Sequence, residues 1–176
     1  MGIPEIQIVE VALKDLGLLQ EIAKRTFYDS FAAMNTAENM QIYTDEYLTD
    51  EKLKAEILNP DSRFFFADNG NAPVGYIKIN RGSAQTVLPN DEAFEIERIY
   101  VDQPFKGGGI GKVLISKAVE LATASRATYL WLGVWENNAP AIRFYEKNGF
   151  KQFSKHIFKL GNDEQTDLLL KRGLRY

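Results

Sequence analysis

The sequence of 176 residues contains no cysteine. This absence excludes disulfide bonds, thiolate nucleophiles, cysteine-ligated zinc and a covalent acyl-cysteine intermediate. Long apolar runs are also absent, since none approaches the roughly 18 residues that a membrane-spanning helix needs. The N-terminal segment carries Glu5 and Glu10 where a secretory signal would have positive charge followed by an apolar stretch. We therefore expect a soluble, cytoplasmic protein with no membrane partner.

Positive charge is too scarce for a nucleic-acid-binding surface. The chain has 21 Lys and Arg against 24 Asp and Glu, a formal net charge of -3, whereas phosphate contacts need concentrated Lys and Arg. Basic residues gather late in the chain, at Lys106, Lys112, Arg143, Lys147 and Lys151. Acidic residues precede most of them, at Asp29, Glu38, Asp45, Glu46, Glu92, Glu95 and Glu97. This asymmetry suits an anionic cofactor and a cationic second substrate, and it equally suits a solvated surface of mixed charge.

Apolar residues, in contrast, are plentiful. They make up 45% of the chain, which fits one domain of ordinary size over residues 1–176. Periodicity predicts strands at residues 6–11, 63–67, 74–79, 93–101, 129–135, 152–159 and 164–171. Helices are predicted at residues 18–27, once or twice within 36–58, and at 110–121 and 140–147. The chain therefore reads as a mixed α/β fold.

The predicted strand at residues 93–101 carries unusual polar residues. Alternation predicts one face made of Glu95, Glu97, Ile99 and Val101. It predicts an opposite face made of Ile96, Arg98 and Tyr100. Two carboxylates are therefore expected side by side on one strand face.

A glycine-rich segment follows this strand and leads into the next predicted helix: Lys106-Gly107-Gly108-Gly109-Ile110-Gly111-Lys112. Free backbone N–H groups and the helix dipole at such a position favour an anion, and phosphate is the natural guest. The segment is not a P-loop, which would have glycine at Lys106 and Ser or Thr at Val113. It is not a dinucleotide fingerprint either, because no frame supplies glycine at the first, third and sixth positions.

The glycine segment resembles motif A of the GNAT superfamily of N-acetyltransferases. In that motif, Arg or Gln, two variable residues, Gly, any residue, and Gly or Ala wrap the pyrophosphate of coenzyme A. Lys106 stands at the first position, and Gly109 and Gly111 stand at the glycine positions. Since Lys departs from Arg or Gln, a contact through the backbone N–H carries over more safely than one through the side chain.

A second stretch, residues 138–150, resembles motif B of the same superfamily. Its matching residues are Asn138, Ala141, Phe144, Tyr145, Gly149 and Phe150. The closer resemblance is to PaiA-type polyamine N-acetyltransferases, and it runs over nearly the whole chain, including residues 64–66, 75–78, 95–101, 131–136 and 163–167. This resemblance implies spermidine or spermine as the acceptor of an acetyl group.

The GNAT resemblance also implies a fold and a cofactor site. We expect a mixed, mostly antiparallel sheet that splays near its middle, with helices on both sides and acetyl-CoA in the splay. No metal is expected. The cofactor-binding residues that the resemblance implies are Ile99, Tyr100, Val101, Lys106, Gly107, Gly108, Gly109, Ile110, Gly111, Lys112, Asn138, Ala141 and Lys147. The backbone N–H of Val101 is the implied oxyanion donor.

Without cysteine, direct attack of the amine in a ternary complex is the economical mechanism. An alkylammonium has a pKa near roughly 10, so the amine arrives protonated and needs a base. Glu95 and Glu97 are the candidates for that base. Tyr145 is the candidate for the general acid that protonates the departing thiolate.

Each of these assignments has a structural alternative. Glu95 and Glu97 are also explained as exposed carboxylates or as attractants for a cationic substrate, and Tyr145 as a core aromatic. Asn138 is a candidate N-cap as well as a cofactor ligand. The lone His156 is left out of the site. Acetylation of another small amine or of a protein amine, CoA binding without turnover, and formation of a homodimer all stay open.

Overall fold

The computed structural model describes residues 5–87 and 89–175, so the ends of the predicted 1–176 domain lie outside the described residues. The strands are β1 (Gln7–Glu10), β2 (Ser62–Asp68), β3 (Pro73–Arg81), β4 (Ala93–Val101), β5 (Tyr129–Trp135), β6 (Lys151–Leu160) and β7 (Asp163–Gly173). The longer helices are α1 (Leu16–Phe31), α2 (Ala37–Tyr47), α3 (Asp50–Leu58), α4 (Ile110–Ala124) and α5 (Ala139–Lys147). None of the helices in the described residues is long and apolar enough to cross a membrane.

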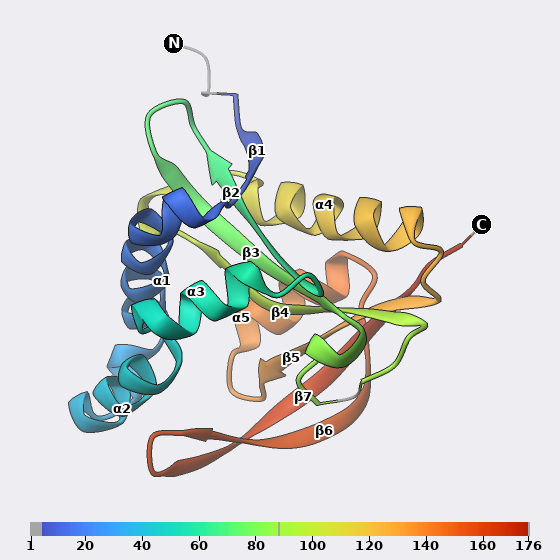
Figure 1. The fold of residues 1–176 in the computed structure, drawn as a ribbon. Coiled ribbons are helices and arrows are strands. Elements are labelled where there is room, and N and C mark those ends of the chain that lie inside the picture. The colour runs from blue at the N-terminus through green and yellow to red at the C-terminus, as the bar shows by residue number, and fades with distance from the viewer. Residues whose placement is uncertain (1–4, 88, 176) are drawn as a thin grey trace.

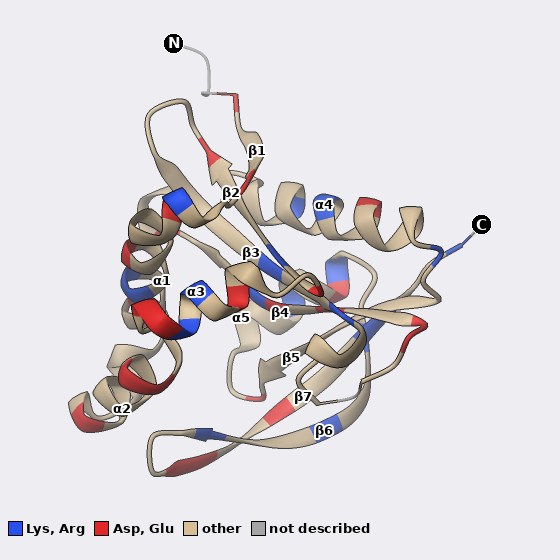
Figure 2. Ribbon diagram, viewed as in Figure 1, with Lys and Arg blue, Asp and Glu red and all other residues tan. Residues whose placement is uncertain are grey.

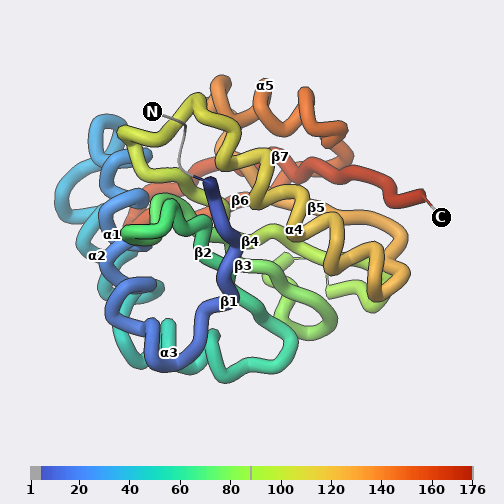
Figure 3. The backbone as a smooth tube through the Cα atoms, turned by 90° about the horizontal axis from the view of Figure 1, so that it is seen from above, coloured from blue at the N-terminus to red at the C-terminus, as the bar shows by residue number. Residues whose placement is uncertain are grey.

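The seven strands form one sheet in the order β1-β2-β3-β4-β5-β7-β6. All neighbouring pairs are antiparallel except β4 and β5, which are parallel. Helices α1, α2 and α3 cover one face of the sheet, and α4 and α5 cover the other (Figures 1 and 3). The expected mixed, mostly antiparallel sheet with helices on both sides is therefore confirmed.

Local sequence signals set several of the boundaries. The side chains of Thr36 and Thr49 accept bonds from backbone N–H groups three residues on, so each caps a helix, and residues 36–58 form two helices rather than one. The Asn69-Gly70 pair turns β2 into β3, with Gly70 at a φ of 93°. Gly149 ends α5 at a φ of 90°, a left-handed backbone that glycine adopts readily.

Two apolar cores lie on the two faces of the sheet. Beneath α4 and α5, residues such as Leu114, Ala118 and Leu132 are buried. Beneath α1, α2 and α3, the buried residues include Phe27 and Tyr76. The sheet between these cores can open only where neighbouring strands are not hydrogen-bonded to each other. This occurs beside β4.

The ladder between β4 and β5 is short. It pairs residues 93–96 with residues 129–132, after which both strands continue without each other. Backbone groups on that edge of residues 97–101 have no strand partner among the described residues. The sheet therefore splays in its middle, and unpaired backbone donors and acceptors face the gap.

A β-bulge at the same place corrects the predicted faces of β4. Lys78 pairs with Arg98 and Ile79 pairs with Ile96, so Glu97 is an extra residue in the ladder. Ile96 therefore packs on the same face as Ile99 and Val101, beneath α4, instead of opposite them. The extra residue reverses the side on which every later side chain of the strand points.

Candidate active site

A cleft of about 1070 Å³ occupies the splay. Its lining comes from both faces of the sheet. Ile110, Val134 and Tyr145 belong to the face under α4 and α5, whereas Phe27 and Tyr43 belong to the face under α1 and α2. The cleft therefore runs through the sheet, with one end at the glycine segment and the other between α2 and the β6–β7 hairpin.

The glycine segment forms the first end of the cleft. Gly109 is the N-cap of α4 with a φ of 86°, a left-handed backbone that suits glycine. The first bond of the helix runs from the Val113 N–H to the Gly109 carbonyl at 3.2 Å, so the preceding N–H groups of the turn face outward. This arrangement fits the pyrophosphate of coenzyme A, because outward N–H groups and the helix dipole both favour an anion.

Gly111 is constrained by the packing of α4 against α5. A methyl group built there would lie 2.9 Å from Phe144 Cζ of α5. No side chain fits at that distance without movement of the ring, so Gly111 allows α4 and α5 to approach closely. Packing between the two helices therefore explains glycine at this position.

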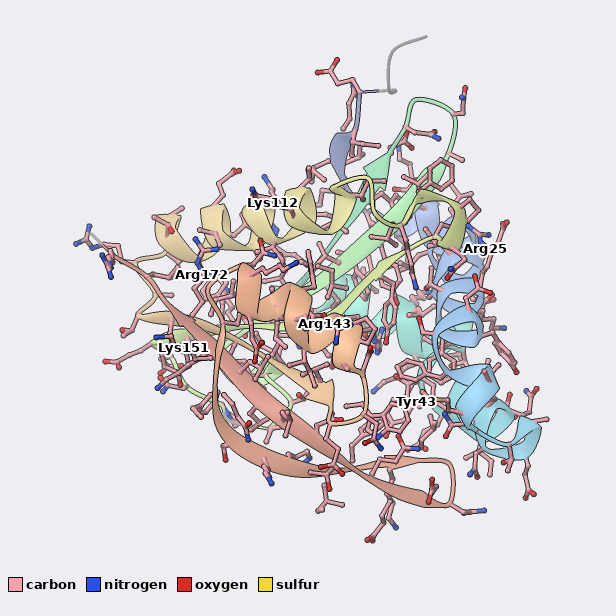
Figure 4. The ribbon with its side chains drawn as sticks, turned by 180° about the vertical axis from the view of Figure 1, so that it is seen from behind. Arg25, Tyr43, Lys112, Arg143, Lys151 and Arg172 are labelled. Carbon is pink, nitrogen blue, oxygen red and sulfur yellow. The ribbon has the colours of Figure 1, made fainter. Side chains whose placement is uncertain are left out.

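Three lysines add positive charge at this end. Lys106, Lys112 and Lys147 line the cleft, whereas Arg143 does not. Figure 4 shows Lys112 on α4 and Arg143 on α5. A cationic rim beside a glycine-built anion site suits a cofactor that carries several phosphates.

Asn138 is the N-cap of α5. Its Oδ1 accepts a bond from the Ala141 N–H at 3.3 Å, and Pro140 lies in the first turn. The predicted cap is confirmed. Both Asn138 and Ala141 line the cleft, so the cap also fixes the backbone that borders the cofactor end.

Tyr145 lies on α5 in the middle of the cleft. It is buried, and its ring meets Phe150 edge-on at a centroid distance of 6.0 Å. Burial raises the pKa of Tyr145 above its ordinary value, so the phenol keeps its proton at neutral pH. A protonated hydroxyl in this place has the form that a general acid requires.

The end of β4 is held in place by an ion pair to α1. Arg25 Nε and Nη2 each donate to a carboxylate oxygen of Asp102 at 2.8 Å. Asp102 follows Val101, whose neighbours Ile99 and Tyr100 also line the cleft. This bidentate pair fixes the strand end that faces the splay.

Glu95 is the best-positioned carboxylate for proton transfer. It is only 3% exposed, and it accepts bonds from Asn80 Nδ2 at 3.0 Å, from the Thr86 N–H at 2.9 Å and from Thr86 Oγ1 at 2.5 Å. Burial raises the pKa of Glu95, although these hydrogen bonds act in the opposite direction. The carboxylate is therefore oriented by three donors and made more basic by its surroundings.

Glu97 belongs to a buried ionic cluster instead. We call the group of Glu56, Lys78, Glu97 and Arg98 the ionic quartet. Lys78 Nζ lies 2.5 Å from a carboxylate oxygen of each glutamate, and Arg98 Nη1 lies 3.1 Å from Glu56 Oε2. Burial alone would raise the pKa of Glu97, but Arg98 and Lys78 outweigh it and lower that pKa. Two positive and two negative charges cancel, so Glu97 offers little net charge to a ligand.

The far end of the cleft is aromatic. Tyr43 of α2 stacks on Phe27 of α1 at 4.2 Å and meets Phe158 of β6 edge-on at 6.2 Å. Burial raises the pKa of Tyr43 to about 12, so this ring is neutral. We call Phe27, Tyr43 and Phe158 the aromatic wall. Aromatic faces suit methylene chains and cations alike.

Sequence reasoning missed several residues of this end. Thr86 lines the cleft from the segment between β3 and β4, and Asp167 and His156 line it from β7 and β6. Trp131 also lines the cleft and donates from Nε1 to Gln85 Oε1 at 2.7 Å. These residues come together across different elements of the fold, so no short sequence pattern predicts their positions. Among the described residues, no group of three or more His, Asp or Glu is arranged to hold a metal ion.

Comparison with known proteins gives the class to which this fold and cleft belong. The sequence matches the Acetyltransferase (GNAT) family over residues 19–150. A protein of Lactobacillus delbrueckii subsp. lactis, described as an uncharacterised N-acetyltransferase, is 39% identical over 169 residues, which cover 96% of this chain and 98% of that protein. The chain belongs to the GNAT family of N-acetyltransferases and uses acetyl-CoA as the acetyl donor.

Two further relatives come from Thermoplasma acidophilum. A spermidine N(1)-acetyltransferase is 27% identical over 150 residues, which cover 83% of this chain and 88% of that protein. The crystal structure of a PaiA N-acetyltransferase in complex with coenzyme A superposes with a TM-score of 0.80 at 23% identity, covering 97% of this chain and 99% of that one. At this identity the structural likeness shows the fold, and the GNAT fold expected from the sequence is confirmed.

Proposed function

We propose that this enzyme transfers the acetyl group of acetyl-CoA to a primary amino group of a polyamine, with spermidine or spermine as the acceptor. The observation that carries the proposal is the division of the cleft. One end is built from glycine and lysine, whereas the other combines the aromatic wall with the carboxylates of Glu95 and Asp167. A polyamine has the matching chemistry, because methylene segments alternate with cations along its chain.

The charge around the second end supports a cationic acceptor. Helix α2 carries Glu38, Asp45 and Glu46 and no Lys or Arg, and Figure 2 shows it marked only in red. Its neighbour, the tip of the β6–β7 hairpin, carries Asp163 and Glu164 at the start of β7 and Lys159 opposite Glu164 at the end of β6, so its net charge is negative. An acidic entrance raises the local concentration of a cationic substrate. The spermidine acetyltransferase of Thermoplasma acidophilum adds the support of a distant relative.

The roles of the site residues follow from their surroundings. Acetyl-CoA supplies an activated thioester. Glu95 takes the proton that the attacking amine must lose, directly or through one water. The backbone N–H of Val101, on the strand edge that faces the splay, donates to the thioester oxygen as negative charge develops there. Tyr145 gives its proton to the departing sulfur. Gly109 and its neighbours hold the pyrophosphate, with Lys106, Lys112 and Lys147 around it.

The test is an acetyl-CoA turnover assay across a panel of amines: spermidine, spermine, putrescine, lysine, an aminoglycoside and a short peptide. Release of free coenzyme A is measured at saturating acetyl-CoA, with the rate in the absence of amine subtracted. We expect the highest kcat/KM for spermidine or spermine. Rapid turnover of a peptide or neutral amine, with none of any polyamine, would overturn the acceptor assignment and leave only the acetyltransferase class.

A further inference from the structure

Asp167 is a cleft carboxylate that none of the roles above uses. It lies on β7, is partly buried and lines the cleft. Within the described parts of the chain, no hydrogen bond or ion pair to its carboxylate is found, and burial is the sole influence on its acidity. A desolvated carboxylate without a partner is costly unless a ligand supplies one.

The backbone beside Asp167 is shaped to make room for it. A methyl group built on Gly133 of β5 would lie 3.3 Å from Asp167 Oδ2, and Gly133 is itself exposed to the cleft. On the same face of β5, Trp131 and Trp135 stand on either side of Gly133. The carboxylate therefore lies against a glycine, where any larger residue would crowd it.

The other cleft carboxylates are already engaged. Glu97 is neutralised within the ionic quartet, and Glu95 accepts three hydrogen bonds from Asn80 and Thr86. Asp167 is thus the carboxylate of the described cleft that keeps its full capacity to accept bonds from a cation.

The sheet register separates Asp167 from the proposed base. Glu95 pairs with Trp131, and Asp167 pairs with Trp135 on the other side of β5. Four residues along a strand correspond to about 13 Å, and the two carboxylates approach the same face from different neighbouring strands. One ammonium group cannot contact both carboxylates at once. A flexible chain that bears two amino groups can.

We propose that Asp167 binds a second, non-reacting ammonium group of the acceptor while Glu95 serves the amine that is acetylated. The inference rests on the proposed function and narrows it to aliphatic diamines and polyamines. The methylene segment between the two amino groups lies against the aromatic wall, and the bound cation satisfies the carboxylate beside Gly133. Asp167 is a specificity-determining residue in this scheme, because an acceptor with a single amino group has nothing to place there.

The acidity of Asp167 adds a pH dependence. Burial raises the pKa of Asp167 to about 6, so it is an anion above that pH and neutral below it. The titratable side chains around it are Glu95 on β4, Glu97 on β4 within the ionic quartet, His156 opposite it on β6, and Lys171 on β7. The Nζ of Lys171 lies over the rings of Tyr129 and Phe153 at 5.2 and 5.0 Å. From the helices, the uncharged ring of Tyr43 faces the cleft. The affinity for a diamine should therefore fall as the pH drops through about 6.

The experiment compares spermidine with n-butylamine in steady-state assays of the wild type and of Asp167→Asn at pH 7.5. Loss of a charge-assisted contact should raise the KM for spermidine about tenfold. The KM for butylamine should change less than about twofold, and calorimetry should give an unchanged affinity for acetyl-CoA. Glu120→Gln is the control, because Glu120 is an exposed carboxylate of α4 that does not line the cleft. It should leave both KM values unchanged.

A second variant guards against a purely structural effect. Gly133→Ala keeps the carboxylate but crowds it, so it should raise the KM for spermidine by a smaller factor. If Asp167→Asn raises both KM values equally, or lowers kcat for both amines at constant KM, the inference is overturned while the polyamine function stands. An unchanged spermidine KM in Asp167→Asn overturns it in the same way. A wild type that acetylates butylamine but not spermidine overturns the proposed function as well.

Discussion

The two ends of the cleft are built in different ways. The end proposed to bind the cofactor comes from two short segments of chain, residues 106–112 and 138–147, and the ligands proposed there are backbone N–H groups at a helix N-terminus. The acceptor end comes from side chains on α1, α2, β4, β5, β6 and β7. A site built from backbone groups can be recognised from the spacing of nearby residues in the sequence. A site built from side chains on many elements cannot. The acceptor end can therefore change without disturbing the cofactor end.

The largest effect should come from the acceptor end. Glu95→Gln keeps the size of the side chain and removes its basicity, so kcat should fall about 10³-fold. Its pKa is raised by burial, so the acid limb of the wild-type rate profile should lie above the ordinary range of a glutamate and should be absent from the residual activity of the variant. Glu92→Gln, an exposed neighbour, should retain full activity. Wild-type kcat in Glu95→Gln would remove the assignment of the base.

Tyr145 stands at the boundary between the two ends. Tyr145→Phe deletes only the hydroxyl, so kcat should fall about 10²-fold while the affinity for acetyl-CoA is preserved. Because burial raises the pKa of this phenol, no rate change due to its ionisation is expected between pH 6 and about 10. A variant with normal kcat would show that Tyr145 only packs against Phe150.

The ionic quartet is buried next to the acceptor end of the cleft. Removing one of its charges should lower the stability of the fold. Lys78→Met leaves two buried glutamates facing one arginine, so the free energy of unfolding should fall by about 3 kcal/mol. Arg63→Met is the control, because it breaks an exposed pair with Glu10 and should cost less than about 1 kcal/mol. Equal losses in urea denaturation would mean that the quartet is no more than a surface pair.

Substitution of Asp167 should have the smallest effect on stability, and it should stabilise the protein instead of destabilising it. Its pKa is raised from 3.8 to about 6 by burial, so the folded protein binds a proton more tightly and loses stability as the pH rises between these values. Asp167→Asn has no carboxyl group at this position, so its stability does not fall in this pH range. Without substrate, its Tm should exceed that of the wild type by about 3 °C at pH 8. The difference should disappear below about pH 4, and a lower Tm at pH 8 would contradict it.

The same comparison explains what the sequence could and could not predict. The glycine turn before α4, the threonine caps and the Asn69-Gly70 turn are all formed by residues that are close together in the sequence. The bulge at Glu97 could not be read from alternation, because an extra residue changes the phase of a strand without changing its composition. The partners of Glu97 lie on α3 and β3.

The position of Asp167 is a long-range feature of the same kind. It depends on a glycine of β5 and on strand register set by the whole sheet. The resemblance to known polyamine acetyltransferases covered its segment but assigned it no role. Pairing and packing across the fold decide such positions, and a single sequence does not display them.

The most direct test of the division between the two ends is a double-mutant cycle with Gly109→Asp and Asp167→Asn. The first places bulk, strain and negative charge where the pyrophosphate binds, and Gly70→Asp is its control, since Gly70 has a similar φ of 93° far from the cleft. We predict that Gly109→Asp raises the KM for acetyl-CoA at least about tenfold and Asp167→Asn does the same for spermidine. Each should leave the other KM within about twofold, and the effects should add in the double variant. A Gly109→Asp enzyme that is folded and has an unchanged KM for acetyl-CoA but a raised KM for spermidine would contradict the account.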